Sequence, residues 1–318
     1  MMRHSLKFLF TGVVAAAFAL IPSNTYSQQR TAAKPATRQI TVVTEPGASV
    51  YINGVRYGTT DESGSIKLRH TPPGSLSLRI RAGGYRDETR VLTAAFSGKI
   101  EVKLSATEDP FDLAFQEAER LSALDRRLAA EAFERAIEIR PKDPNARLAL
   151  ARLLTEMREY QRAEEAVAEA RKLRPSFAEA SAVEGRIFRE EGDFERAVAA
   201  FERGIREANG VHPEAAAGLG LLYADMAETA AAELDIEAEE RYKKLAIKRL
   251  TQAKDQLYGA EDAIIIYQLL GRALEKQNLL NEAIAVYERF LEIFPDVPDA
   301  TAVRSFIVQL NIQLKERR

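Results

Sequence analysis

Residues 194–204, FERAVAAFERG, set the period that decides the fold of most of this chain. The stretch 34 residues earlier, at 160–170, reads YQRAEEAVAEA, and the one before it, at 126–136, reads RRLAAEAFERA. Each stretch has a small residue, a larger side chain and a second small residue at matching places: Ala129, Phe133, Ala136; Ala163, Val167, Ala170; Ala197, Phe201, Gly204. Self-similarity at this spacing predicts stacked structural units.

Each unit is expected to be a helical hairpin, because small residues let two helices approach, a larger side chain fills the gap, and Pro141 or Pro175 ends the second helix. The units 144–177, 178–211 and about 264–297 carry the pattern, and 110–143 carries it in its second half. This pattern resembles the tetratricopeptide repeat. The resemblance implies an all-α solenoid whose concave groove binds an extended peptide or a partner helix.

The fourth unit, within residues 213–260, departs from this period. Gly220 and Ala246 are 26 residues apart where the other units have 12, and the excess around 225–245 is rich in Ala, Glu and Lys. Such residues favour helix, so we expect two longer helices and not a floppy loop. Residues 298–318 have one apolar stripe and a charged end, which predicts a helix that caps the repeats of 110–297.

Residues 38–105 have a different pattern. The short segments RQITVVT, ASVYING, GSIKLRH, GSLSLRIRA, TRVLTA and GKIEVKLS alternate apolar and polar residues or carry β-branched runs, and turn formers such as EPG, NG, ESG, PPG and GG lie between them. This predicts a small β-sandwich, so the whole fold class is multidomain: an all-β sandwich followed by an all-α solenoid. In one strand Leu76, Leu78 and Ile80 should face the core, and Arg79 and Arg81 should face water.

The β-segment resembles the PEGA module, named for a Pro-Glu-Gly-Ala turn before a strand. Here the turn reads Glu45-Pro46-Gly47-Ala48, so Pro and Glu are exchanged, and Tyr51, Asn53-Gly54 and Gly84-Tyr85 follow the pattern. The stretch 59–85 is also similar to the carboxypeptidase regulatory-like sandwich. Either resemblance implies an extracytoplasmic module that displays, spaces, or binds protein or polysaccharide, with no catalytic residues.

Residues 1–27 have the pattern of a signal peptide: a basic start, an uncharged apolar run at 8–21, and small residues Thr25 and Ser27 before a cut. The apolar run is shorter than the roughly 20 residues of a membrane-spanning helix, although an uncleaved anchor stays an alternative. Residues 28–37 read as a linker. We therefore expect export to a bacterial periplasm or cell surface, with no transmembrane segment after cleavage.

Composition excludes several kinds of chemistry. The chain has no Cys, no Trp and three His, so disulfides, Cys-His metal sites and thiol nucleophiles are ruled out. Residues 28–105 hold 12 basic and 6 acidic side chains, while 106–318 hold 31 and 41. Neither part has the basic stripe of a nucleic-acid binder. The basic module has either a solvated face or an affinity for an anionic surface.

No motif indicates catalysis, a cofactor or a metal site. A phosphate-binding Gly loop, a Ser-containing elbow and a His-Glu metal motif are all missing from the sequence. Asp61 and Glu62 beside Gly64 could form a calcium loop or an ordinary turn with solvated carboxylates, but the full spacing of oxygen ligands is not there. The sequence therefore predicts a protein without enzymatic activity.

The candidate partner-binding residues follow the small residue of each first helix. They are Arg152, Arg186, Leu221 and Arg272, with Arg189 one turn beyond Arg186. One hypothesis is that these arginines bind carboxylates of an acidic peptide, since the planar guanidinium suits two parallel hydrogen bonds. The alternative is pairing along their own helices, Arg152 with Glu156 and Arg186 with Glu190.

Two classes of function remain. In the first, the chain is a protein-interaction scaffold that binds a protein or peptide through its repeats and docks at the cell envelope through its sandwich. In the second, the sandwich at 38–105 binds cell-wall or surface polysaccharide and the repeats recruit another protein. Because fold does not fix function, the partner has to be argued from the site.

Overall fold

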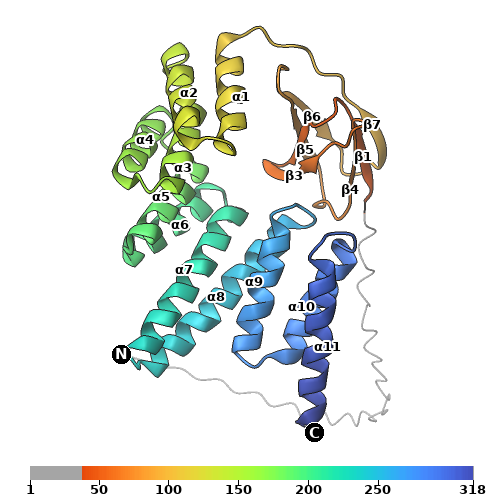
Figure 1. Ribbon diagram of the computed structural model, residues 1–318, viewed down its shortest axis with the longest axis vertical. Helices are drawn as coiled ribbons and strands as arrows, with labels where there is room; N and C mark the ends of the chain where they lie inside the picture. The colour runs from red at the N-terminus through yellow and green to blue at the C-terminus, as the bar shows by residue number, and fades with distance from the viewer. Residues whose placement is uncertain (1–37, 318) are drawn as a thin grey trace, which may run out of the picture. The chain divides into compact units, whose positions relative to one another are not determined.

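The computed structural model describes residues 38–317, in which seven strands precede eleven helices (Figure 1). The strands are β1 (Ile40–Val43), β2 (Ser49–Ile52), β3 (Val55–Thr59), β4 (Ser65–Leu68), β5 (Leu76–Arg81), β6 (Glu88–Leu92) and β7 (Gly98–Glu101). The helices are α1 (Pro110–Ser122), α2 (Arg126–Ile139), α3 (Pro144–Glu156), α4 (Tyr160–Leu173), α5 (Ala178–Glu191), α6 (Phe194–Glu207), α7 (Pro213–Ala232), α8 (Ile236–Leu257), α9 (Ala263–Lys276), α10 (Leu280–Ile293) and α11 (Ala300–Glu316). The expected signal peptide and linker lie outside the described residues.

The strands form two sheets that share one core. One sheet has the order β4-β1-β7, with β7 parallel to β1, and the other has the antiparallel order β3-β2-β5-β6. Leu76, Leu78 and Ile80 are fully buried between them, as the alternation of this strand predicts. The opposite face of β5 is less exposed to solvent than expected, because Arg79 and Arg81 are half-buried.

Strand β3 was not among the expected strand segments. Asn53 and Gly54 both have positive φ, 50° and 83°, and they turn the chain from β2 directly into β3. An Asn-Gly pair is the sequence that such a two-residue turn favours. Tyr57 and Gly58 of β3 are nevertheless buried, so this edge strand is covered by something other than the sandwich.

The helices form five hairpins of consecutive helices, α1–α2 through α9–α10, and α11 packs on α10 (Figure 1). Glycines mark where helices approach most closely. A Cβ on Gly185 or Gly218 would lie 2.7 or 2.3 Å from the ring of Phe201, and a Cβ on Gly271 would lie 2.3 Å from Tyr287. The aromatic residue of a second helix therefore fills the space that the glycine leaves open, which is the packing that the period predicts.

The hairpin α7–α8 is longer than the others. Helices α7 and α8 have 20 and 22 residues, whereas α5, α6, α9 and α10 each have 14. The extra residues lie in both helices and the connecting turn stays short. Ala227 and Ala230 are buried in the added length, so small side chains keep the two helices together there.

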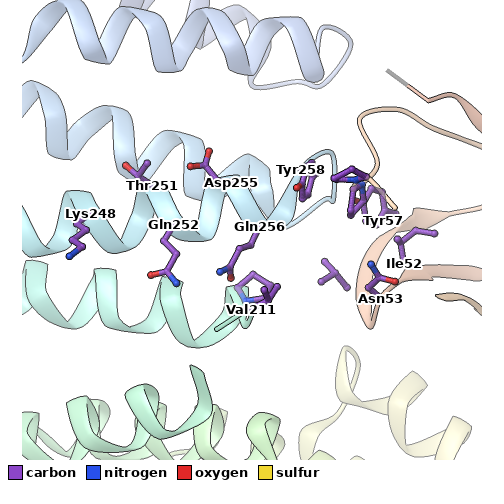
Figure 2. A pocket seen from close by; sticks show the side chains of 14 residues that line it. Ile52, Asn53, Tyr57, Val211, Lys248, Thr251, Gln252, Asp255, Gln256 and Tyr258 are labelled. Atoms are coloured by element: carbon purple, nitrogen blue, oxygen red, sulfur yellow. The ribbon is translucent and has the colours of Figure 1, made fainter. Parts of the chain in front are cut away.

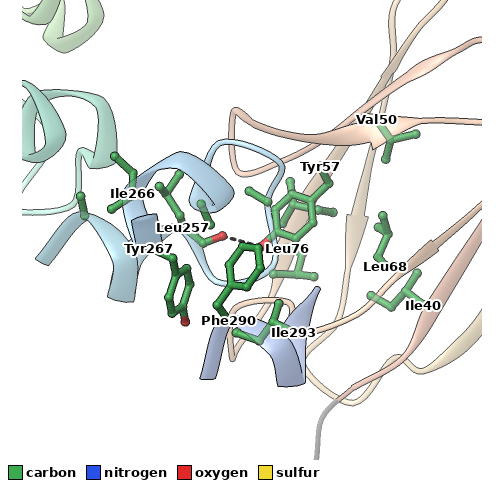
Figure 3. Close-up of a cluster of buried hydrophobic side chains, with 14 of the residues drawn as sticks. Ile40, Val50, Tyr57, Leu68, Leu76, Leu257, Ile266, Tyr267, Phe290 and Ile293 are labelled. Carbon is green, nitrogen blue, oxygen red and sulfur yellow. Dashed lines mark hydrogen bonds between the residues drawn. The ribbon is translucent and has the colours of Figure 1, made fainter. Parts of the chain in front are cut away.

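The sandwich packs on the turn between α8 and α9. Tyr57 of β3 is buried and its hydroxyl donates a hydrogen bond to the carbonyl of Leu257 at 3.4 Å (Figure 3). Nearby, the Gly259 amide donates to the carbonyl of His70 at 3.0 Å, and Arg56 Nη1 lies 2.7 Å from Glu261 Oε2. Burial raises the pKa of the Tyr57 hydroxyl well above its ordinary value.

This contact joins two hydrophobic cores into one. A single cluster of buried side chains runs from Ile40, Val50 and Leu76 of the sandwich to Ile266 and Phe290 of α9 and α10 (Figure 3). The repeats from α1 to α5 have a separate cluster of their own. The sandwich is therefore packed as part of the C-terminal repeats, despite its position at the other end of the sequence.

The sandwich also contacts the first helix. Arg81 pairs with Asp87 and with Glu119 of α1, and its guanidinium lies over the ring of Phe115 at 5.3 Å from the centroid. The side chain of Gln116 accepts from the Gly84 amide at 2.8 Å. These polar contacts explain why the outer face of β5 is not solvated.

Replacing Gly259 with alanine tests the contact between the sandwich and the α8–α9 turn. The new Cβ would lie 2.3 Å from the carbonyl oxygen of Arg69, so backbone must move. We expect Gly259→Ala to lower the free energy of unfolding by about 1–3 kcal/mol, measured by urea denaturation. Gly83→Ala is the matched control, because nothing lies within 4 Å of that position. Equal unfolding curves for the two variants would contradict the contact.

Candidate partner-binding face

Four of the five candidate residues lie on consecutive first helices. Arg152 is on α3, Arg186 and Arg189 are on α5, and Leu221 is on α7; all four are half-buried. Helix α5 contacts both α3 and α7. We call the surface formed by these three helices around Arg152, Arg186 and Arg189 the inner face.

Arg152 has a carboxylate partner two units away. Its Nη1 and Nη2 lie 2.6 and 2.7 Å from Oε1 and Oε2 of Glu214, at the start of α7. The pair therefore spans α5 and links helices α3 and α7 directly. Glu156, the partner proposed along the same helix, pairs instead with Arg126 at 3.6 Å.

Glu214 lies in the first turn of α7, after His212 has capped the helix by accepting from the Ala215 amide at 3.1 Å. Burial by itself would raise the pKa of the Glu214 carboxyl. The charge and hydrogen bonds of Arg152, with smaller contributions from His212 and Arg186, outweigh burial and hold this pKa below its ordinary value. Glu214 is therefore a fixed anion within the inner face.

Asp262 extends this charge cluster toward the sandwich. Burial raises the pKa of the Asp262 carboxyl above its ordinary value, and the carboxylates of Glu214 and Glu261 add to the shift, while Arg56 and Arg152 oppose it. No motif in the sequence predicts that these residues would meet. They come from β3, α3, α7 and the turn before α9, and only the folded chain brings them together.

The other candidate arginines differ in how their charge is compensated. Arg189 Nε donates to Asp225 of α7 at 2.6 Å. The Nε atom of Arg186 is buried and has no hydrogen-bond partner among residues 38–317, and Glu190 lies 3.4 Å from Arg189 instead. Arg272 is exposed on α9, and no described contact joins it to the other candidates. Arg186 is therefore the inner-face arginine that still needs an acceptor.

A pocket lies between the sandwich and the α7–α8 hairpin (Figure 2). Its volume is about 600 Å³, and both apolar and polar side chains line it. Strand β2 contributes Ile52, the turn after it contributes Asn53, and α8 contributes Thr251, Gln252 and Gln256. The Oε1 atom of Gln256 is buried without a partner within the described chain. No sequence motif indicated this pocket, because its walls come from two modules.

Neither a metal-binding group of side chains nor a membrane-spanning helix is found in the described part of the chain. No group of three or more His, Asp or Glu side chains in residues 38–317 could hold a metal ion. The Asp61 carboxylate accepts from the amides of Ser63 and Ser65, both at 2.9 Å, so its oxygen supports a turn. Among the described helices, none combines the length and apolar character needed to cross a bilayer.

Comparison with protein families matches both modules. Residues 37–107 match the PEGA domain. Residues 121–187, 182–246 and 264–297 match tetratricopeptide repeat families. A comparison with curated proteins gives no match.

Solved structures show the helical fold. The yeast Tom70 structure is 16% identical, with a TM-score of 0.52, over 65% of this chain and 41% of Tom70. A tetratricopeptide protein of Thermus thermophilus, TTC0263, is 23% identical over 62% of this chain and 99% of its own length, with a TM-score of 0.48. Pseudomonas aeruginosa PilF is 16% identical over 65% and 90%, with a TM-score of 0.46.

The ion pair across the inner face predicts a pH-dependent stability. Because the pKa of Glu214 is depressed on folding, its carboxylate contributes stability above the ordinary value of 4.5, and this contribution is lost as the pH falls through the folded pKa. We expect Glu214→Gln to lower the free energy of unfolding at pH 7 by about 1–2 kcal/mol, a value between those of exposed and buried pairs. Urea denaturation from pH 7 to pH 3 should show the difference vanish.

Asp262→Asn is the control of opposite sign. The pKa of Asp262 is raised on folding, so its carboxylate costs stability at neutral pH and this cost disappears as the group becomes protonated. Asp262→Asn should therefore be at least as stable as wild type at pH 7. A Glu214→Gln deficit that persists unchanged at pH 3 would show that the pair contributes through shape and not through charge.

Proposed function

We propose that this chain, which consists of a PEGA domain followed by tetratricopeptide repeats, is an exported protein-binding scaffold without catalytic activity of its own. The proposal rests on the repeats, since stacked helical hairpins present a wide surface to another protein. The leader-like pattern of residues 1–27 supports export to a periplasm or cell surface.

The inner face favours a partner with a carboxylate. Arg152 and Arg189 already have carboxylate partners, but the buried Nε of Arg186 has no acceptor among the described residues. A carboxylate of a partner peptide would pair with the accessible part of this half-buried guanidinium through a charge-assisted hydrogen bond, since the buried Nε itself is out of reach of a ligand. Leu221, half-buried on the neighbouring α7, would contact the apolar part of the same peptide. Arg272 belongs to a different part of the repeats in this proposal.

The sandwich would dock the scaffold at the envelope. Together with the linker before it, the sandwich carries twice as many basic as acidic residues, 12 against 6 over residues 28–105, which suits an anionic envelope surface. Because the sandwich shares a hydrophobic cluster with α9 and α10, it would hold the repeats at a defined orientation and would not act as a loose tether.

An envelope polysaccharide is the second candidate ligand, and the pocket favours it. Asn53, Gln252 and Gln256 provide amides, and Tyr57 and Tyr258 provide aromatic rings, which are groups that suit an uncharged ligand rich in hydroxyls. In this alternative, the sandwich and α8 bind the glycan together, so the sandwich by itself would be an incomplete site.

A crosslinking pull-down from the envelope fraction tests the scaffold proposal. The full chain is compared with Arg186→Ala and with Arg135→Ala, a control on the exposed surface of α2. We expect Arg186→Ala to weaken binding of the captured protein about 10- to 100-fold, the range of one charge-assisted hydrogen bond, and Arg135→Ala to leave it unchanged. Arg152→Ala is a poor probe, because it would leave Glu214 unpaired. Equal capture by all three proteins would place the binding site elsewhere.

Occluding the pocket tests the polysaccharide alternative. Thr251→Trp places a large side chain among the lining residues, so it should abolish retention on isolated cell-wall material if the glycan binds there. Retention is measured at moderate salt, which removes contacts that depend only on exposed charge. The Arg186→Ala variant should be retained normally. Retention of Thr251→Trp at the wild-type level would exclude the pocket as a glycan site.

A further inference from the structure

Four of the hairpin turns have the same backbone. In each, an amide donates to a carbonyl five residues earlier at 2.9 Å: Glu159 to Leu154, Asp193 to Phe188, Asp235 to Ala230 and Leu279 to Leu274. The preceding residue has positive φ in every case, and these residues are Arg158, Gly192, Leu234 and Asn278. The four turns can therefore be compared position by position.

The turn of the long hairpin differs from the others in its side chains. Leu234 is 85% exposed, and the polar or small residues Arg158, Gly192 and Asn278 take its place in the other three of these turns. The α1–α2 turn, which has a different backbone, exposes a single leucine, Leu124, before its cap Asp125. Two residues after Leu234, Ile236 is 73% exposed. Its counterparts Tyr160, Phe194 and Leu280 are half-buried or buried. We call the exposed pair Leu234 and Ile236 the apolar tip.

The apolar tip does not serve the stability of the fold. Leu234 has a φ of +61°, a conformation that crowds the Cβ against the neighbouring carbonyl; Arg158 shares it, whereas Gly192 and Asn278 adopt it at less cost. Two large aliphatic side chains that are exposed to water do not contribute the stabilisation that their burial would provide. Local rules that are broken without a structural gain are expected at sites with another role.

The tip is also held in a fixed conformation. Ala227 and Ala230 are buried between α7 and α8, the Asp235 amide completes the turn, and the Asp235 side chain caps α8 by accepting from the Ala238 amide at 3.0 Å. A rigid apolar projection loses little conformational entropy on binding. These contacts make the tip a preformed element for docking.

Charge around the tip restricts what it can bind. Residues 228–240 contain six acidic side chains and no Lys or Arg. Lys276 pairs with Glu228, and Lys243 pairs with Glu239 and Glu240, but Glu233 and Glu237 beside the tip have no ion pair within residues 38–317. An anionic lipid surface would repel these acidic side chains, whereas lysines or arginines on a protein would attract them.

We propose that the apolar tip is a second protein-docking element, separate from the inner face, and that its partner is a protein with an apolar cleft bordered by Lys or Arg. Leu234 and Ile236 would enter the cleft, and Glu233 and Glu237 would pair with the basic border. The extra length of α7 and α8 places this element beyond the turns of the 14-residue hairpins.

Site-specific photocrosslinking in producing cells tests the proposal. A crosslinking side chain replaces Leu234 in the full chain, and the matched control carries it at Arg158, the equivalent position of the α3–α4 turn. We expect a protein adduct from position 234 alone, mapped by mass spectrometry to an apolar cleft bordered by basic residues. Ile236→Ser and the double change Glu233→Lys with Glu237→Lys should each reduce the adduct about tenfold or more.

Two control variants, one for folding and one for the inner face, distinguish this proposal from the proposed binding at the inner face. Leu234→Asn should melt at the wild-type temperature or above it, because Asn tolerates the left-handed conformation, and it should nevertheless lose the partner. Arg186→Ala should leave the adduct at position 234 intact. The proposal is overturned by an adduct with a second copy of this chain, an adduct with lipid, insensitivity to the charge reversal, or no adduct from position 234.

Discussion

The contact between the sandwich and the turn at residues 257–261 is the constraint on which the rest of the structure depends. In a stack of helical hairpins each unit contacts its neighbours, so the stack bends easily. Here β5 and the Gly84 region contact α1, while Tyr57 and Arg56 contact the turn that follows the fourth hairpin. One small module therefore bridges helices far apart in the stack. The pairing of Arg152 with Glu214 across α5 fits a stack whose curvature is fixed in this way.

The local parts of this architecture could be predicted from the sequence. A period of 34 in Ala129, Ala163 and Ala197 follows from packing between adjacent helices, and such contacts leave a regular trace in the sequence. Strand β5 could also be predicted, since the buried residues Leu76, Leu78 and Ile80 alternate with polar ones. Strand β3 was missed, because Val55–Thr59 is short and its burial depends on the repeats and not on its own pattern. Long-range contacts of this kind have no periodic signature.

In the candidate site, too, local features could be predicted from the sequence and long-range contacts could not. The sequence placed Arg152, Arg186 and Arg189 on first helices, because the position after a small residue recurs in each unit. It could not name Glu214 as the partner of Arg152, since that residue is 62 positions away and lies in an ordinary helix start. Nor could it distinguish Arg186 from its neighbours. The absence of a hydrogen-bond partner for the buried Nε of Arg186 within the described chain arises from three-dimensional packing, which leaves no pattern in the sequence.

The shared hydrophobic cluster has a consequence for how the chain acquires its structure. Tyr57 and Leu257 are 200 residues apart, so the surface of β3 stays uncovered until most of the chain is present. Closing so large a loop is slow compared with forming a single hairpin, which needs only local contacts. The N-terminal module, although made first, would be completed last. Until then its exposed aromatic and aliphatic edge is open to pairing with other chains, and a holding chaperone would matter most during this interval.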